Sequence, residues 1–197
     1  MRTVAALILA AGGSSRFGRS KQLISYQGET LIARAVRIAG EARCTPVAVV
    51  LGGSSADVGR ELHGSSVLIV QNDNWELGLG SSIRAGVLAL LSSEPELEAI
   101  VLLACDQPRV EASTLVALID QQQRSAKAIV ASYYVDTLGI PALFTRSVFG
   151  ELLALPDHSG AKGLIESRSH DVASVAFDDG AIDVDTPADL QRLLHDG

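Results

Sequence analysis

Short apolar runs alternate with amphipathic segments along almost the whole chain, and this alternation constrains the fold more than any other feature. It predicts repeated βαβ units and a parallel sheet with helices on both faces. We therefore expect one α/β domain over residues 1–197, with an open, twisted, mostly parallel sheet as the middle of three layers. The predicted strands are Val4–Leu9, Val47–Leu51, Val67–Val70, Ile100–Ala104, Ile129–Tyr133 and Val172–Phe177, and the predicted helices begin near Thr30, Ser55, Ser81, Ala112, Arg146, Gly160 and Pro187.

The composition supports a buried sheet and argues against some partners. Hydrophobic residues make up 47% of the chain but aromatic residues only 4%, so the core must consist of Ala, Val, Leu and Ile, which suit buried parallel strands. A net charge of −7 argues against non-specific binding to nucleic acid or to a membrane surface. Cys44 and Cys105 form no close motif and the first apolar run is too short to span a bilayer, so we expect a cytoplasmic protein.

The first predicted strand leads into a loop of small residues that ends at Lys21. Small residues let the backbone approach a ligand and turn its N–H groups inward. Arg16, Arg19 and Lys21 place three cations within six residues of a net-acidic chain, a combination that suits a triphosphate. The loop fits neither the P-loop nor the dinucleotide fingerprint, and the alternative interpretation is a flexible turn with solvated basic residues.

The sequence from Leu9 to Lys21, L-A-A-G-x-S-x-R-x-G-x-x-K, resembles the signature of the MobA-like nucleotidyltransferases. The resemblance extends over essentially the whole chain and is closest to the molybdenum cofactor cytidylyltransferase group. It implies a Rossmann-like nucleotidyltransferase fold, whose first loop wraps the triphosphate, with Arg16 and Lys21 in contact with the phosphates. The loop residues that it assigns to the nucleotide are Leu9, Ala10, Ala11, Gly12, Gly13, Ser14, Ser15, Arg16 and Lys21.

A carboxylate, Asp106, follows the fourth predicted strand, separated from it only by Cys105. A side chain at the carboxyl end of such a strand faces the ligand crevice of an open α/β sheet. Mg²⁺ prefers one or two carboxylates together with phosphate oxygens and water, so Asp106 is a candidate metal ligand. A turn-forming Asp before Pro108 is the alternative, but D-Q-P resembles the family's metal-binding element. Cys105 is interpreted as a small buried residue.

A second acidic cluster precedes the last predicted helix. Asp183 and Asp185 are two residues apart, so in an extended segment both side chains project to the same side and could complete a metal site with Asp106. The alternative is an Asp-rich surface turn at a helix N-terminus. D-x-D-T-P-x-D-L resembles the family's closing motif, and which of the two residues binds the metal stays open. Asp189 is interpreted as an ordinary helix residue.

A Gly- and Ser-rich stretch opens the helix near Ser81. Its amides and hydroxyls could contact a ligand, and the alternative is an ordinary capped helix with Trp75 packed on the core. The resemblance implies that this stretch lies beside the nucleobase. Its sequence is similar to that of the cytidylyltransferases, and Ala11 also fits that group. The nucleotide-binding residues implied here are Gly78, Gly80, Ser81 and Ser82.

Gly139, Pro141 and Lys162 match family positions on the side of the acceptor. Ile140 departs from the polar residue often found in the cytidylyltransferases, which leaves the identity of the acceptor open. For Lys162 the alternative is a solvated lysine at a helix start. The four histidines show no metal-ligand spacing, so we expect each of them at the surface.

The reaction implied by the resemblance is transfer of CMP from CTP to the terminal phosphate of a molybdopterin-type cofactor, with release of pyrophosphate. Mg²⁺ is the implied cofactor, Arg16, Lys21 and Asp106 are the implied catalytic residues, and a molybdenum hydroxylase is a candidate partner. Three alternatives stay open: transfer to another phosphorylated acceptor, a dinucleotide-dependent oxidoreductase, and a non-catalytic cofactor carrier.

Overall fold

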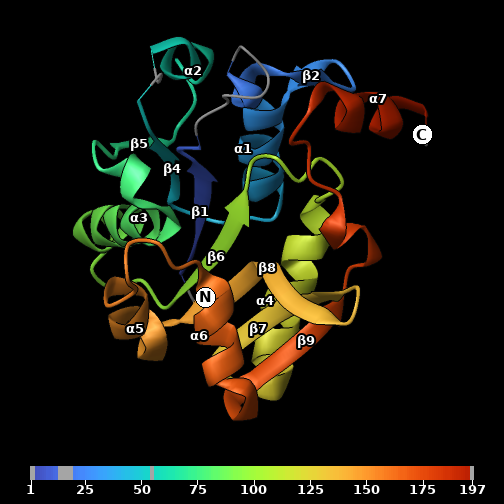
Figure 1. The fold of residues 1–197 in the computed structure, drawn as a ribbon. Coiled ribbons are helices and arrows are strands. Elements are labelled where there is room, and N and C mark those ends of the chain that lie inside the picture. Colours follow the sequence, from blue (N-terminus) through green and yellow to red (C-terminus); the bar gives the residue numbers. More distant parts are fainter. Residues whose placement is uncertain (1–2, 13–19, 54–55, 196–197) are drawn as a thin grey trace.

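A seven-stranded sheet forms the middle layer of the structure, with the strand order β5-β4-β1-β6-β8-β7-β9 (Figure 1). The computed structural model describes residues 3–12, 20–53 and 56–195. All strands of this sheet run in one direction except β8, so the predicted α/β fold with a mostly parallel sheet is confirmed. The strands are β1 (Val4–Ala10), β4 (Val47–Leu51), β5 (Leu68–Gln71), β6 (Ala99–Ala104), β7 (Ile129–Tyr134), β8 (Thr137–Thr145) and β9 (Val172–Ala176).

Strand β8 is the main departure from the predicted elements. It lies antiparallel between β6 and β7, and the sequence conceals it because Gly139 and Pro141 lower strand propensity. Across β7, Ala142 pairs with Ala131 and Gly139 with Ser132, so a bulge takes residues 140 and 141 out of the ladder. Pro141 has no N–H to donate to a neighbouring strand. Because the bulge places residue 141 outside the ladder, no ladder hydrogen bond is lost at the proline.

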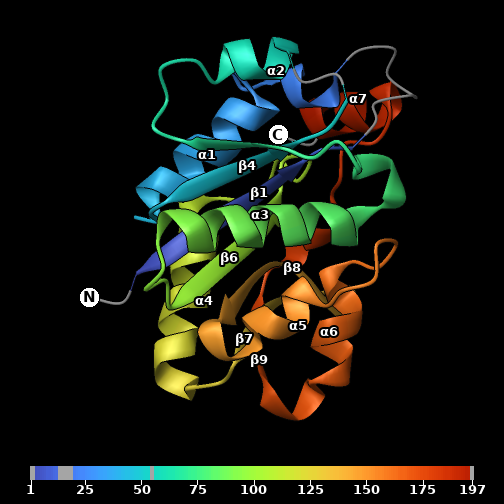
Figure 2. The same cartoon turned by 90° about the vertical axis from the view of Figure 1, so that its left-hand side faces the viewer.

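Seven helices match the predicted starts: α1 (Leu31–Glu41), α2 (Ala56–Glu61), α3 (Leu79–Ser93), α4 (Ala112–Ser125), α5 (Phe149–Leu153), α6 (Ala161–Ser167) and α7 (Pro187–His195). Helices α3, α5 and α6 pack on one face of the sheet, and α1, α2 and α4 pack on the other (Figures 1 and 2). Leu7 and Leu9 of β1 point to the first face, whereas Ile8 and Ala10 point to the second, as the alternation of a strand requires. No helix in the described ranges is long and apolar enough to cross a membrane.

Helix α7 belongs to neither layer. Its Leu193 packs with Ile24, Leu31 and Val184 in a small separate cluster, beside a hairpin of β2 (Ser25–Tyr26) and β3 (Glu29–Thr30) that the sequence did not predict. This cluster fixes the C-terminal segment next to the residues that follow the Gly-rich loop.

The order of the strands creates a switch point between β1 and β6. From β1 the chain proceeds to β4 and β5 on one side, and then returns across the sheet to β6 on the other side. Leu9 pairs with Ala104, and the N–H of Cys105 donates to the oxygen of Leu9 at 3.2 Å. The segments after β1 and β6 therefore leave the sheet side by side, at the edge where open α/β sheets bind ligands.

Residues 155–160, which we call the strap, lie across the start of α3. The N–H of Gly80 donates to the oxygen of Asp157 at 2.8 Å, and Arg84 donates to the oxygen of Leu155 and forms an ion pair with Asp157. Gly78 has a φ of 125°, a conformation that favours glycine. A side chain at either glycine would overlap the main chain of the strap. The strap continues directly into α6.

We expect Gly80→Ala to lower the free energy of unfolding by about 2 kcal/mol or more, because a Cβ atom there would lie 2.0 Å from the oxygen of Pro156. The matched control is Gly40→Ala in α1, where a Cβ atom meets nothing within 4 Å. That variant should gain up to about 1 kcal/mol from helix propensity. Urea denaturation of both variants measures the difference. Equal stabilities would mean that the strap yields to a methyl group at position 80.

Candidate active site

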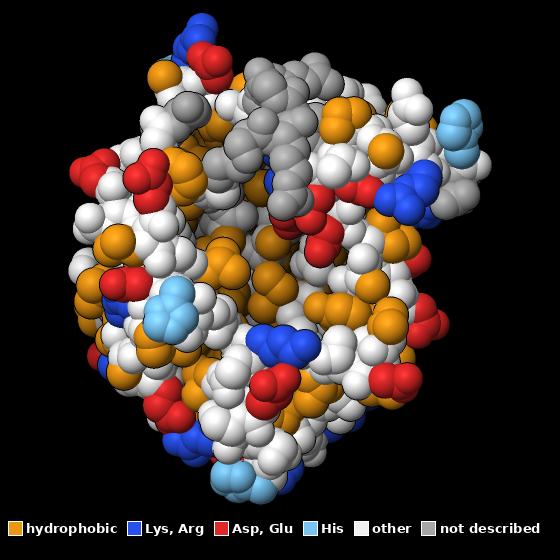
Figure 3. Space-filling view, in the orientation of Figure 1, with side chains coloured by type: hydrophobic (Ala, Val, Ile, Leu, Met, Phe, Trp, Pro, Cys, Tyr) orange, Lys and Arg blue, Asp and Glu red, His pale blue; other side chains and the backbone are white. Residues whose placement is uncertain are grey.

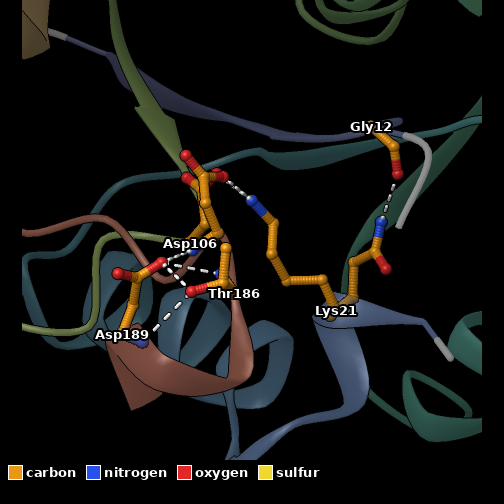
Figure 4. A network of polar contacts seen from close by, with 7 residues as sticks. Gly12, Lys21, Asp106, Thr186 and Asp189 are labelled. Carbon is orange, nitrogen blue, oxygen red and sulfur yellow. Dashed lines mark hydrogen bonds and ion pairs between the residues drawn. The ribbon is translucent and has the colours of Figure 1, made fainter. Parts of the chain in front are cut away.

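Lys21 connects two carboxylates that lie far apart in the sequence. Its Nζ atom is 2.6 Å from Oδ2 of Asp106 and 2.8 Å from Oδ1 of Asp185 (Figure 4). Lys21 begins a short 3₁₀ helix just after the Gly-rich loop, Asp106 follows β6, and Asp185 precedes α7. The switch point thus brings together three residues that the sequence predicted as catalytic or metal-binding.

Main-chain contacts hold the segment of Asp183 and Asp185 against the end of β6. The N–H of Val184 donates to the oxygen of Asp106 at 3.0 Å, and the side chain of Val184 is fully buried. Because Asp183 and Asp185 flank this anchor, their carboxylates stay close to that of Asp106.

Asp189 has a role that the sequence analysis missed. Its Oδ2 atom accepts hydrogen bonds from the N–H of Thr186 at 2.7 Å and of Asp185 at 3.1 Å, and the N–H of Asp189 donates to the Thr186 hydroxyl at 3.3 Å (Figure 4). This reciprocal pair is a capping box, and the spacing T-P-x-D is visible in the sequence. The hydrogen bond from the Thr186 side chain is the main cause that lowers the pKa of Asp189. The cap fixes the main chain of Asp185.

The charges of this cluster influence one another. Burial acts to lower the pKa of Lys21, but the charges and hydrogen bonds of Asp106 and Asp185 outweigh it, so the pKa is raised and the ammonium stays charged. Desolvation, followed by the charges of Asp106 and Asp185, raises the pKa of Asp183 to about 6. Asp183 nevertheless remains exposed to solvent on one side.

The base of the Gly-rich loop is held by Gln22, a buried residue that the sequence analysis did not single out. Its Nε2 atom donates to the oxygen of Ala10 at 2.6 Å and of Gly12 at 3.3 Å. Leu9, Ala10 and Ala11 are buried, so they can contact a ligand mainly through their main chain. Gly13, Ser14, Ser15 and Arg16 lie outside the described residues.

The start of α3 is a closed hydrogen-bond network. Nδ2 of Asn72 donates to the hydroxyls of Ser81 at 2.9 Å and Ser82 at 3.0 Å, and the Ser81 hydroxyl contacts the oxygens of Asn74 and Gly78. Both serines are buried. The expectation that their hydroxyls are open to a ligand is therefore not met, because the turn itself uses them.

The predicted acceptor residues differ in their exposure to solvent. Lys162 is exposed near Glu166, with 4.0 Å between the charged atoms, whereas Gly139 and Pro141 are buried. A Cβ atom at Gly139 would meet the hydroxyl of Tyr134 at 2.1 Å, so this glycine makes room for the tyrosine.

Gln107, directly after Asp106, connects β8 with the segment that precedes Asp183. Its Nε2 atom donates to the oxygens of Ile140 at 3.2 Å and Gly180 at 3.0 Å. The residue is buried, and its Oε1 atom has no hydrogen-bond partner within the part of the chain that the structure describes. Gln107 thereby fixes the distance between β8 and the segment that carries Asp183.

Cys105 and the four histidines do not provide a nucleophile or a metal ligand at the Lys21 cluster. Burial, followed by the charge of Asp106, raises the pKa of the Cys105 thiol, which therefore stays protonated. His63, His158, His170 and His195 are exposed, as predicted. In the described ranges, no group of three or more His, Cys, Asp or Glu side chains is arranged to hold a metal ion. Between Asp106 and Asp185 lies the Lys21 ammonium instead.

The molecule is hollowed on the face shown in Figure 3, and acidic side chains gather on one side of the hollow. Hydrophobic side chains line much of its floor. A phosphate-bearing ligand in this hollow would therefore need a cation on the acidic side.

Comparison with known proteins agrees with this geometry. A family model described as the MobA-like NTP transferase domain matches residues 6–172. Nicotine blue oxidoreductase of Paenarthrobacter nicotinovorans is 34% identical over 144 residues, which span 73% of this chain and 67% of that protein. A protein of Bacillus cytotoxicus named as a probable molybdenum cofactor guanylyltransferase is 28% identical over 66% of this chain and 62% of its own length.

A solved structure is similar over nearly the full length. Rv0371c of Mycobacterium tuberculosis H37Rv, crystallised as a complex with manganese, is 32% identical and has a TM-score of 0.81. The match covers 99% of this chain and 100% of that chain. A similar protein of the same fold thus binds a divalent cation.

The raised pKa of Asp183 predicts a pH-dependent stability. Between the ordinary value of 3.8 and about 6 the folded protein binds more protons than the unfolded chain, so stability falls as pH rises through this window. We expect Asp183→Asn to be more stable than the wild type above about pH 6, and the difference to vanish below about pH 4. Denaturation in a chelating buffer at several pH values tests this. A variant less stable than the wild type at neutral pH would contradict it.

Proposed function

The chain belongs to the MobA-like NTP transferase family of nucleotidyltransferases, and from this premise we propose that it transfers CMP from CTP to the terminal phosphate of a molybdopterin-type cofactor, releasing pyrophosphate. The observation that carries the proposal is the meeting of Lys21, Asp106 and Asp185 at the switch point. A triphosphate held by the Gly-rich loop would lie directly beside these carboxylates.

The attacking group needs no activation by a base. The second pKa of a phosphate monoester is about 6, so the acceptor phosphate is already largely dianionic at neutral pH. This agrees with a site whose thiol is protonated and whose histidines lie elsewhere on the surface. We infer that the chain contributes alignment and charge stabilisation rather than proton transfer.

Mg²⁺ is the metal that we propose for the site. Carboxylate oxygens of Asp106 and Asp185 already converge on one cation, and such hard oxygen donors fit a divalent ion, with Asp183 as a further candidate ligand. When bound, Mg²⁺ would neutralise phosphate charge and help to align the reacting oxygens. The manganese complex of Rv0371c supports a divalent cation.

Lys21 and Arg16 are proposed to stabilise the charge that develops on the phosphates and on the leaving pyrophosphate. Lys21 follows the loop immediately, and Gln22 secures the main chain at the base of the loop. The flexible side chain of Lys21 can therefore reach a phosphate without movement of β1.

CTP is proposed as the nucleotide because of the residues around Ala11. The oxygen of Ala11 lies so near Gly52 that a Cβ atom there would be 2.5 Å from it, and the ring of Trp75 covers Gly52 and Gly53. We infer that a base placed beside this tightly packed turn would have little room, which would favour a pyrimidine over a purine. Since Ser81 and Ser82 are engaged with Asn72, the segment of residues 78–82 would act on the base by positioning the turn.

The acceptor side is proposed to comprise Gly139, Pro141 and Lys162. Gln107 couples this side to Asp106, because it bonds the main chain of β8 and follows Asp106 directly. We expect the protein to act in the cytoplasm and to supply a molybdenum hydroxylase with its cofactor.

A second candidate function follows from the similarity to nicotine blue oxidoreductase. An oxidoreductase of this fold would bind a flavin or a nicotinamide dinucleotide and would show its absorbance. Release of pyrophosphate from CTP, dependent on a molybdopterin acceptor, separates the two functions directly.

We expect Asp106→Asn to reduce transfer by about a hundredfold or more, because the variant loses about 3 kcal/mol of charge stabilisation in the transition state. Asp120→Asn, an exposed carboxylate on α4, is the matched control and should keep full activity. Pyrophosphate release is measured with purified protein at saturating Mg²⁺. Rates within threefold of the wild type would remove Asp106 from the site.

Competition between CTP and GTP tests the proposed base. The wild type should prefer CTP, and Ala11→Gly should weaken the preference by about 1 kcal/mol without reversing it, because the buried methyl group of Ala11 helps to hold the main chain beside the proposed base site and one methyl group contributes about that much. A wild-type preference for GTP would overturn the choice of base and leave nucleotide transfer standing.

A further inference from the structure

The Lys21 ammonium lies where a divalent cation would have to lie. It is 2.6 Å from an oxygen of Asp106 and 2.8 Å from an oxygen of Asp185, and its side chain is only 16% exposed (Figure 4). Divalent cations bind carboxylate oxygens at about 2.0–2.6 Å, which requires the same oxygens at shorter distance. An ammonium and a metal ion cannot share this position.

We propose that Lys21 is a tethered counter-ion, which pairs with Asp106 and Asp185 in the metal-free protein and is displaced when a divalent cation binds to them. Displacement frees the ammonium for the phosphates of the nucleotide; the metal site and this last step rest on the proposed function, whereas the ion pairs of Lys21 do not. Lys21 thus has two positions, and the metal selects between them.

The arrangement of the chain permits this exchange without a large movement. Gln22 anchors the main chain next to Lys21 by bonding to the oxygens of Ala10 and Gly12, so only the lysine side chain has to rotate. The carboxylates are independently fixed, since Val184 bonds to the main chain of Asp106 and Asp189 caps the segment of Asp185. They therefore stay in place when the ammonium leaves.

The exchange couples the metal to the nucleotide. A phosphate that attracts Lys21 removes the ammonium that competes with the metal for the carboxylates, and so raises the affinity for the metal. By linkage, bound metal must raise the affinity for that phosphate by the same factor. Loss of Lys21 should consequently have two opposite effects: transfer becomes slower, whereas the free protein binds the metal more tightly.

Chemical labelling of the wild-type protein tests the displacement. The chain contains three lysines, Lys21, Lys127 and Lys162, which mass spectrometry can follow separately after brief treatment with acetic anhydride. Adding Mg²⁺, at constant ionic strength and without nucleotide, should increase labelling of Lys21 severalfold. Labelling of Lys127 should not change, because this residue lies at the N-terminal end of β7, away from the site, and donates to the oxygen of His170. Unchanged or decreased labelling of Lys21 would overturn the proposal.

Direct Mn²⁺ binding gives a second measurement. By calorimetry, Lys21→Met should bind Mn²⁺ on the order of three- to tenfold more tightly than the wild type, as expected for removal of two partly exposed ion pairs. Lys127→Met is the matched control and should bind like the wild type. Equal or weaker binding by Lys21→Met would overturn the proposal, and if that variant fails to fold, labelling of the wild type still decides.

Both measurements omit nucleotide and acceptor, so their outcome is independent of the proposed transfer. Absence of pyrophosphate release together with displacement of Lys21 would overturn only the proposed function. Normal transfer without displacement would overturn only the counter-ion role.

Discussion

The parallel pairing of β1 with β6 is the constraint on which the site depends. Leu9 lies beside Ala104, and the hydrogen bond from Cys105 to Leu9 continues the pairing past the end of the strand. Because the chain leaves β1 toward one side of the sheet and returns to β6 on the other, no helix separates the two segments that follow. Asp106 therefore emerges next to the Gly-rich loop.

Around this point the fold holds like charges together. Three carboxylates lie close enough to repel one another: burial, followed by the charges of Asp106 and Asp185, raises the pKa of Asp183. Main-chain hydrogen bonds, a capping box and the ammonium of Lys21 keep them in place. Such a cluster favours an additional cation, which is the physical argument behind the proposed metal site.

Several glycines that resemble ligand contacts are explained by packing. Gly78 and Gly80 leave room for the strap, while Gly139 and Gly180 leave room for the ring of Tyr134. The strap and the ring in turn fix α6 and the segment before Asp183. The start of α3 and the segments around β8 are thus parts of one packed framework, although the sequence separates them by more than one βα unit.

The sequence by itself determined the layers and nearly all the strands and helices, because hydrophobic period and apolar runs are local signals. It also singled out Lys21, Asp106 and Asp185 as candidate site residues, from their places in three short motifs and from the resemblance to the family. It could not give β8, whose glycine and proline contradict strand propensity and whose pairing depends on neighbours distant in the chain. Nor could it give the ion pairs of Lys21, the burial of Ser81 and Ser82, or the bridge made by Gln107. These depend on the distances between segments, and only the packed sheet sets those distances.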